Sequence, residues 1–219
     1  MSDILIGIDP HTQPSFSLRN RLRRLLWGMF SVVFYRSTPR PFHAWRAFVL
    51  RCFGARLGSG CHFYPQVTIW APWNLEAGDQ VVVGNGANLY NMAKITIGRR
   101  AVISQGAHLC CGGHDIEDPN FQLIASPICV GDRAWVCADA FIAAGVTVGE
   151  GAVVGARAVL VKDAEPWGVY AGHPAKFIKS RVLRDTERIE RAERGTDRLQ
   201  RAARVQNEML VDSDVVALP

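Results

Sequence analysis

A period of six residues runs through the middle of the chain and limits its fold more than any other feature. From Val130 onward every sixth residue is a branched aliphatic, and the residue after most of them is small. These repeat positions are Val130, Val136, Ile142, Val148, Val154 and Leu160. Such a period matches neither an α-helix nor the alternation of a simple strand, and it indicates a short strand followed by a corner. The pattern therefore predicts a solenoid.

The same register occurs earlier in the chain, where its blocks begin at Leu57, Ala77 and Ile97, each followed by glycine. Three six-residue units close a triangular coil, and successive coils stack about 4.8 Å apart. A β-sandwich would show period-two alternation and irregular turns instead. The sequence therefore predicts a mainly β chain with a parallel β-helix of about five coils over residues 57–165.

The register is interrupted once. The coil that opens at Ile97 should reach its next start near Asp115 or Glu117, but the register resumes only at Val130. The intervening residues 115–129 are rich in turn formers and charges, so they are predicted to leave the coil as an excursion loop. A long loop inside a compact repeat usually carries function.

Several motifs resemble one family. The hexapeptide rows, the G-G-H-D of residues 112–115 and the V-Y-A-G-H-P-A-K of residues 169–176 resemble the hexapeptide acetyltransferases, with the maltose, galactoside and nodulation-factor enzymes closest. The N-terminal stretches R-L-L-W-G-M-F, R-S-T-P-R-P-F-H-A-W-R and F-G-A-R-L-G are similar to colanic-acid-type exopolysaccharide acetyltransferases. The resemblance covers about residues 18–180.

This resemblance implies a left-handed β-helix that assembles as a homotrimer with active sites between subunits. It implies acetyl-CoA as co-substrate and direct transfer, without an acyl-enzyme, to a sugar hydroxyl of an exopolysaccharide or of a lipid-linked saccharide precursor. The implied setting is cytoplasmic, with a saccharide acceptor as partner.

The predicted catalytic residues are His114, Asn91 and Asp115. Histidine suits a general base because its ordinary pKa lies near 6.5, and His114 stands where the coil opens into the loop, beside Asp115. Counting along the repeat places Asn91 next to Cys111 on the following coil. The resemblance makes Asn91 a site residue, although an asparagine that satisfies a turn remains an equal alternative.

The cofactor-binding positions come from the resemblance alone. Trp135 is expected to wall the thioester pocket or to cover a subunit contact. The backbones at Ala138 and Ala156 are expected to approach the pantetheine arm. Lys162 and Lys179 match cationic positions near the CoA phosphates, with solvated surface lysines as the alternative. Val161 occupies a further cofactor-binding position, where the family commonly has threonine.

The sequence bears on three alternative functions. A metal enzyme like the γ-class carbonic anhydrases would need converging histidines, but His62, His108 and His114 fall at different corners. A six-residue face spans up to about 20 Å, whereas two ligands of one ion lie within about 4 Å, so no metal site is expected in one chain. N-acyl transfer to an amino sugar would need an anion such as Asp115, Glu117 or Asp118. A non-catalytic scaffold should lack the histidine and its loop.

The six cysteines follow no zinc or disulfide spacing, which indicates small buried side chains in a reducing compartment. Cys110 and Cys111 are weak candidates for a nucleophile because no cation activates them.

The two ends have their own character. Residues 1–17 are predicted to be flexible. Residues 18–56 are predicted to form a helical segment, with two helices over residues 18–52 separated by residues 37–41. Residues 10–75 contain nine arginines and no acid. The helices either cap the open end of the solenoid or contact anionic lipid at the inner membrane face, and the two readings are compatible. Residues 166–219 are predicted to close the solenoid and to continue as a charged helix. Neither end interleaves aromatic and basic residues as a nucleic-acid reader would.

Overall fold

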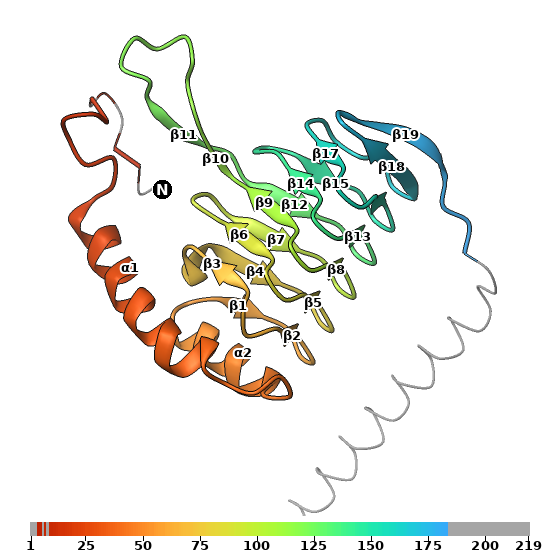
Figure 1. The fold of residues 1–219 in the computed structure, drawn as a ribbon, viewed down its shortest axis with the longest axis horizontal. Helices are drawn as coiled ribbons and strands as arrows, with labels where there is room; N and C mark the ends of the chain where they lie inside the picture. The colour runs from red at the N-terminus through yellow and green to blue at the C-terminus, as the bar shows by residue number, and fades with distance from the viewer. Residues whose placement is uncertain (1–3, 6, 8, 184–219) are drawn as a thin grey trace, which may run out of the picture. The chain divides into compact units, whose positions relative to one another are not determined.

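A computed structural model describes residues 4–5, 7 and 9–183 as a left-handed parallel β-helix with a helical cap at its N-terminal end (Figure 1). The first face contains β1 (Arg56–Leu57), β4 (Leu75–Ala77), β7 (Ile95–Ile97), β12 (Ile128–Val130) and β15 (Thr147–Val148). The second face contains β2 (His62–Phe63), β5 (Val82–Val83), β8 (Val102–Ile103), β13 (Trp135–Val136), β16 (Val153–Val154), β18 (Gly168–Gly172) and β19 (Ala175–Ser180). The third face contains β3 (Thr68–Ile69), β6 (Asn88–Tyr90), β9 (His108–Cys110), β14 (Phe141–Ile142) and β17 (Val159–Leu160).

The register follows the repeat. Leu57 pairs with Ala77, and Ala77 pairs with Ile97, so each step along a face joins one repeat position to the next. Five strands on the first and third faces give five complete coils. A sixth begins where Ala164 bridges to Val148 and β18 joins β16, and the antiparallel strand β19 then ends the second face. The predicted fold class and the estimate of about five coils are confirmed.

The small residues beside the repeat positions are required by the rung spacing. Ile97, Ile103 and Leu109 are at most 1% exposed and fill the interior of one coil. A Cβ on Gly78 would lie 2.8 Å from the amide nitrogen of Arg99 on the next coil, closer than carbon and nitrogen can approach. The corner therefore admits only glycine, which explains why an aliphatic–glycine pair opens each block.

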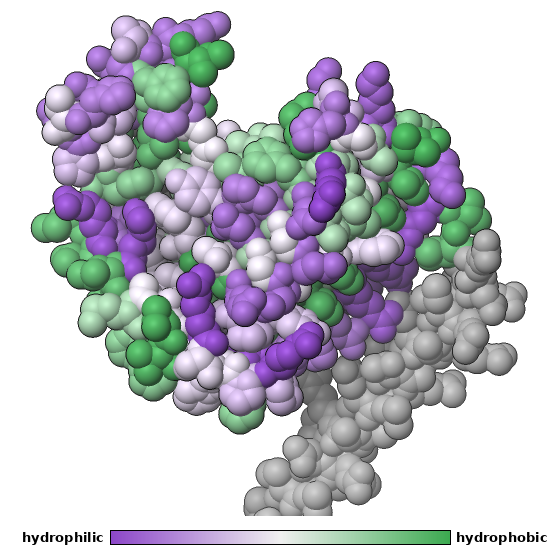
Figure 2. All heavy atoms as spheres, in the orientation of Figure 1, coloured by the Kyte–Doolittle hydropathy of each residue, from purple (hydrophilic) through white to green (hydrophobic). Residues whose placement is uncertain are grey.

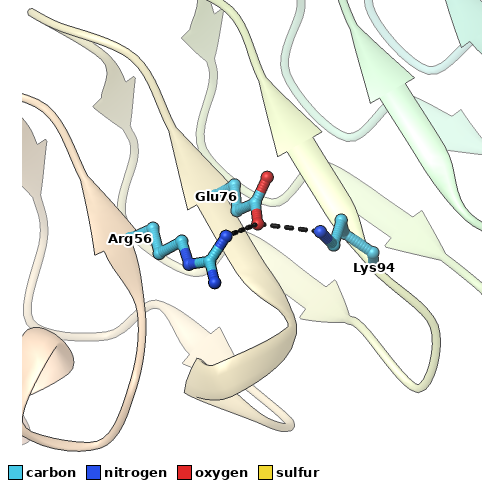
Figure 3. Close-up of polar contacts among 3 residues, drawn as sticks. All are labelled: Arg56, Glu76 and Lys94. Atoms are coloured by element: carbon cyan, nitrogen blue, oxygen red, sulfur yellow. Dashed lines mark hydrogen bonds and ion pairs between the residues drawn. The ribbon is translucent and has the colours of Figure 1, made fainter. Parts of the chain in front are cut away.

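Charges outside the solenoid pair along the stack. Glu76 on β4 lies between Arg56 on β1 and Lys94, with its Oε1 3.3 Å from Arg56 Nη1 and 2.8 Å from Lys94 Nζ (Figure 3). Together these contacts lower the pKa of Glu76, chiefly through the hydrogen bond from Lys94. Because all three groups reach solvent, the pairs fix side-chain positions more than they stabilise the fold.

A helical cap covers the first coil. It consists of α1 (Leu18–Phe30), the π-helical turn η1 (Ser31–Arg36) and α2 (His43–Cys52), while the short 3₁₀ helix η2 (Pro72–Asn74) lies within the solenoid. The cap donates at least one hydrogen bond to a carbonyl on each face of the first coil. Trp27 Nε1 donates to Ile69 (2.7 Å), Arg46 Nε to Phe63 (2.6 Å) and Arg51 Nη2 to Leu57 (3.1 Å). These donors satisfy the open strand edges that a solenoid end otherwise exposes.

Arg46 holds the cap together. It is fully buried and also donates to the carbonyls of Pro39 and Arg40 and to Thr38 Oγ1, at 2.6–2.8 Å. These bonds fix the turn between η1 and α2 against the first coil. These hydrogen bonds support the prediction that residues 18–56 cap the solenoid.

The segment before α1, expected to be flexible, has defined partners. Ile4 forms an antiparallel bridge with Phe16, and the side chain of Gln122 in the excursion bonds to the backbone of Leu5 and Gly7. The predicted charged helix of the C-terminus lies outside the described residues.

We expect Arg46→Met to destabilise the protein by about 2–4 kcal/mol, because the carbonyls of Phe63, Pro39 and Arg40 would lose the guanidinium donor. Urea unfolding of the purified protein measures this change. The control is Arg19→Met on α1, where an exposed arginine is replaced and the change should stay within about 0.5 kcal/mol. Equal effects of the two substitutions would contradict the role given to Arg46.

Candidate active site

The excursion is a β-hairpin that projects from the corner between the third and first faces (Figure 1). Its strands are β10 (Gly112–His114) and β11 (Leu123–Ala125), paired antiparallel so that His114 lies opposite Leu123. The chain leaves the coil at Gly112, three residues before the predicted start of the loop. His114 therefore ends a strand and is held by a paired backbone.

The ring of His114 is fixed in one tautomer. Its Nδ1 lies 2.7 Å from the carbonyl oxygen of Phe121. A carbonyl only accepts, so Nδ1 carries the proton and Nε2 keeps its lone pair. The ring also stacks on that of Phe121, with centroids 4.4 Å apart and planes at 11°. Phe121 has a φ of 52°, a left-handed conformation that presents ring and carbonyl together to one histidine.

The acidic residues of the hairpin stabilise its turns. Asp115 Oδ1 accepts from the Glu117 amide (3.0 Å), and Asp118 Oδ1 accepts from the Asn120 amide (2.7 Å). The Phe121 carbonyl, and not a carboxylate, accepts the hydrogen bond that orients the His114 ring. These contacts give Asp115 a place in the turn, and its catalytic role remains a prediction without a supporting contact.

The side chain of Asn91 is directed into the solenoid. It is fully buried, its Oδ1 accepts from the Ala71 amide (2.9 Å), and its Nδ2 donates to the Ala71 carbonyl (2.6 Å). Both polar atoms are thus committed to the preceding coil. These contacts favour the turn-satisfying alternative, because the corner turns this side chain inward, and the catalytic role of Asn91 stays a prediction.

An aromatic row that the repeat count missed lies on the outside of the third face. Trp70, Tyr90, His108 and Phe141 follow one another on successive rungs, with neighbouring ring centroids 5.3–6.5 Å apart. Tyr90 abuts the base of the hairpin, since a Cβ on Gly112 would lie 2.9 Å from its Cε1. The signal was available in the sequence, because residues 88, 90 and 108 alternate with buried repeat positions and so must face outward.

Burial keeps this row uncharged. Desolvation raises the pKa of Tyr90, and it lowers the pKa of His108. Both side chains are therefore neutral at physiological pH, and Asn88 Nδ2 lies 3.4 Å from His108 Nε2. A neutral, aromatic and partly polar surface beside a histidine suits a sugar ring better than an ion.

The predicted CoA-binding residues lie elsewhere on the chain. Trp135 is on the outside of the second face, 45% exposed, and donates to Ser104 Oγ (2.9 Å). Ala138 and Ala156 stack at the next corner, where the Arg157 amide donates to the Ala138 carbonyl (2.9 Å). Lys179 lies on β19 of the second face, paired with β18. Val161 and Lys162 follow β17 at the end of the third face.

Alternative chemistries find little support in the described residues. Within residues 4–5, 7 and 9–183, no three His, Cys, Asp or Glu side chains are placed to hold a metal ion. Burial raises the pKa of Cys111 to about 12, so this thiol stays protonated and inert.

Comparison with known proteins identifies the family of this chain. Over 163 residues it is 41% identical to the putative colanic acid biosynthesis acetyltransferase WcaF of Escherichia coli, covering 74% of this chain and 90% of the relative. This chain belongs to the hexapeptide-repeat acetyltransferases. No family model matches it.

Solved structures agree on the fold. A hexapeptide-repeat acetyltransferase of Vibrio cholerae, solved with acetyl-CoA, superposes with a TM-score of 0.70 at 23% identity, over 76% of this chain and 91% of that one. A galactoside acetyltransferase solved with coenzyme A also gives 0.70, at 24% identity, over 77% and 86%. These acetyltransferases thus share the fold over 76% and 77% of this chain.

We expect Asn91→Ala to lower the free energy of unfolding by about 2–4 kcal/mol, because the Ala71 amide would lose its partner inside the solenoid and the Ala71 carbonyl would keep only the Asn74 amide as donor. Urea unfolding checks this. At a temperature where the variant is folded, its turnover should stay within about threefold of wild type. A stable variant with severely reduced turnover would restore the catalytic reading.

Proposed function

We propose that this chain transfers an acetyl group from acetyl-CoA to a hydroxyl of a sugar, in an exopolysaccharide or its lipid-linked precursor, with His114 as general base. The observation that carries the proposal is the Nδ1–H bond from His114 to the Phe121 carbonyl, which leaves Nε2 basic. The 41% identity to an acetyltransferase named for colanic acid biosynthesis supports a saccharide acceptor.

The reaction needs no acyl-enzyme. Nε2 of His114 takes the proton of the acceptor hydroxyl while the hydroxyl oxygen attacks the thioester carbonyl. The tetrahedral intermediate then collapses, the carbon–sulfur bond breaks, and the imidazolium returns its proton to the leaving thiolate. Throughout, the Phe121 carbonyl holds the ring in place through Nδ1.

O-transfer is preferred over N-transfer to an amino sugar. An ammonium acceptor would require a carboxylate close to the base. The carboxylates of Asp115 and Asp118 instead accept hydrogen bonds from backbone amides within the hairpin.

We further propose that the working unit is a C3 homotrimer with each site shared by two chains. The aromatic row belongs to the third face and His114 to the hairpin that leaves the corner after this face, whereas Trp135 and Lys179 belong to the second face. One chain therefore carries the two halves of the site on different sides of its prism. Threefold closure can bring the third face of one subunit to the second face of the next.

We expect His114→Ala to lower kcat by about 10²–10⁴ while CoA binding is retained, because a general base contributes about that factor. Steady-state acetylation of a verified sugar acceptor and calorimetric titration with CoA measure the two quantities. Turnover close to wild type would rule out His114 as the base.

The same variant tests whether the site is shared. His114→Ala and the double variant Lys162→Glu, Lys179→Glu are each expected to be inactive alone, and co-expressed trimers should regain about a quarter of the sites by random mixing. No recovery in verified mixed trimers would mean that each site lies in a single chain.

We also propose a cytoplasmic location with peripheral contact at the inner membrane face. No helix in the described part of the chain is long and apolar enough to cross a bilayer. The cap buries Trp27 and Tyr35, but the opposite side of α1–η1 stays exposed, and apolar side chains gather there (Figure 2). Its large exposed residues are Leu18, Leu22, Leu25, Leu26, Met29, Phe30, Val32, Val33 and Phe34.

This exposed face of α1–η1 has the chemistry of an interfacial helix. Such a large apolar stripe is unusual on a free surface. The exposed Arg19 and Arg21 lie on the same helix, and residues 10–75 contain no acid to oppose anionic headgroups. Apolar burial together with arginines near an anionic surface provides stable peripheral binding.

We expect the protein to sediment with vesicles of phosphatidylglycerol and phosphatidylcholine at low salt. Val33→Glu should reduce vesicle binding about tenfold, because it places a charge on the face of α1–η1 that would be buried in the lipid. Ile178→Glu on β19 is the matched control, since Val33 and Ile178 are equally exposed at 59%. If the protein remains in the supernatant, the membrane proposal is wrong and α1–η1 only caps the solenoid.

A further inference from the structure

A cavity of about 790 Å³ lies between α1–η1 and strand β3 at the start of the third face. One wall is apolar, with Leu25, Met29 and Val32 from the helix and Val67 from the coil. Arginines line the remainder, namely Arg21 and Arg24 on one side of α1 and Arg36 at the end of η1. The cavity thus combines an apolar wall with a cationic lining.

The three arginines are positioned without acidic partners. Arg24 lies over the ring of Trp70, with Cζ 4.2 Å from its centroid, and Arg36 Nη2 donates to Thr68 Oγ1 (3.0 Å). Among the described residues none of the three takes part in an ion pair, and residues 10–75 contain no carboxylate side chain. Guanidinium groups held in this way match the oxygens of a phosphate or diphosphate.

A row of neighbouring side chains connects the cavity to the base of the hairpin that carries His114. Arg24 covers Trp70, the Trp70 and Tyr90 rings are 6.1 Å apart, and Tyr90 abuts Gly112, two residues before His114. Two rung spacings and two strand residues give a path on the order of 15 Å from Trp70 to His114. The aromatic row along this path offers faces on which a sugar can stack.

We propose that this cavity binds the phosphate groups and the first isoprenoid units of a lipid-linked saccharide acceptor, so that its sugar extends along the aromatic row to His114. The inference rests on the proposed function and specifies its acceptor as a prenyl-phosphate-linked sugar. The arginines bind the phosphates, and the apolar wall receives the chain. The exposed face of α1–η1 borders the same cavity, so the lipid can remain in the bilayer while its head is bound.

The test is binding of farnesyl diphosphate, followed by calorimetry and by the fluorescence of the tryptophans that line the cavity. Arg24→Gln and Arg21→Gln should each weaken binding about tenfold, the value of one charge-assisted hydrogen bond. Arg23→Gln is the matched control and should change affinity less than twofold. Arg23 stacks on Trp73 at 4.0 Å, as Arg24 does on Trp70, but it does not line this cavity.

Two further ligands identify what is recognised. Inorganic diphosphate and farnesol should each bind much more weakly than farnesyl diphosphate, because each satisfies only one part of the cavity. Inorganic diphosphate that binds as tightly would reduce the site to one for free phosphates and overturn the lipid assignment. Absence of farnesyl diphosphate binding to the wild type, or equal loss in Arg23→Gln, would overturn the proposal.

This binding assay separates the two proposals, because it uses neither acetyl-CoA nor turnover. Binding of farnesyl diphosphate to His114→Ala should match wild type, so a failure of the catalytic assignment would leave the cavity intact. Conversely, acetylation of a soluble sugar without any binding of farnesyl diphosphate would reject the cavity alone.

Discussion

The spacing of about 4.8 Å between stacked coils is the constraint on which the rest of the structure depends. At this spacing each face admits one large inward side chain per rung, and the corners admit glycine, as at Gly78. It also creates an open edge at the first coil that needs hydrogen-bond donors. Trp27, Arg46 and Arg51 supply one to each face. The arginine-rich N-terminus is thus partly a consequence of the β-helix, because guanidinium groups donate and never accept.

The repeat predicted the fold well because each rung contacts only its neighbours, so the sequence period is also the spatial period. The site was less accessible to the same reasoning. Counting placed Asn91 on the correct rung, but the direction of a corner side chain depends on backbone geometry, and Asn91 turns inward to Ala71. The outward neighbour Tyr90 was therefore missed. The Phe121 carbonyl that fixes His114 arises from a chain reversal seven residues away, which no repeat encodes.

The acid-free run of arginines shows why composition alone left two readings open. Arg46 is fully buried among carbonyls, Arg51 bonds to the first coil, and Arg23 stacks on Trp73. Arg19 and Arg21 remain exposed on α1. A residue type with five donors serves both as a structural cap and as a cationic surface. Only the direction of each side chain on α1 and α2 separates the two uses, so capping and the proposed membrane contact would use different sides of one helix.

The cap and the hairpin are also joined directly. Gln122 follows Phe121 in the hairpin, and its amide accepts from the Gly7 backbone and donates to the Leu5 backbone, while Phe16 packs on Trp70 at 5.1 Å. The segment before α1 therefore connects the loop that orients His114 to the aromatic row beside the cavity. A chain that binds a lipid-linked acceptor at its cap must hold the base at a fixed distance from that cap. These contacts provide such a link on the outside of the solenoid, where the repeat itself offers none.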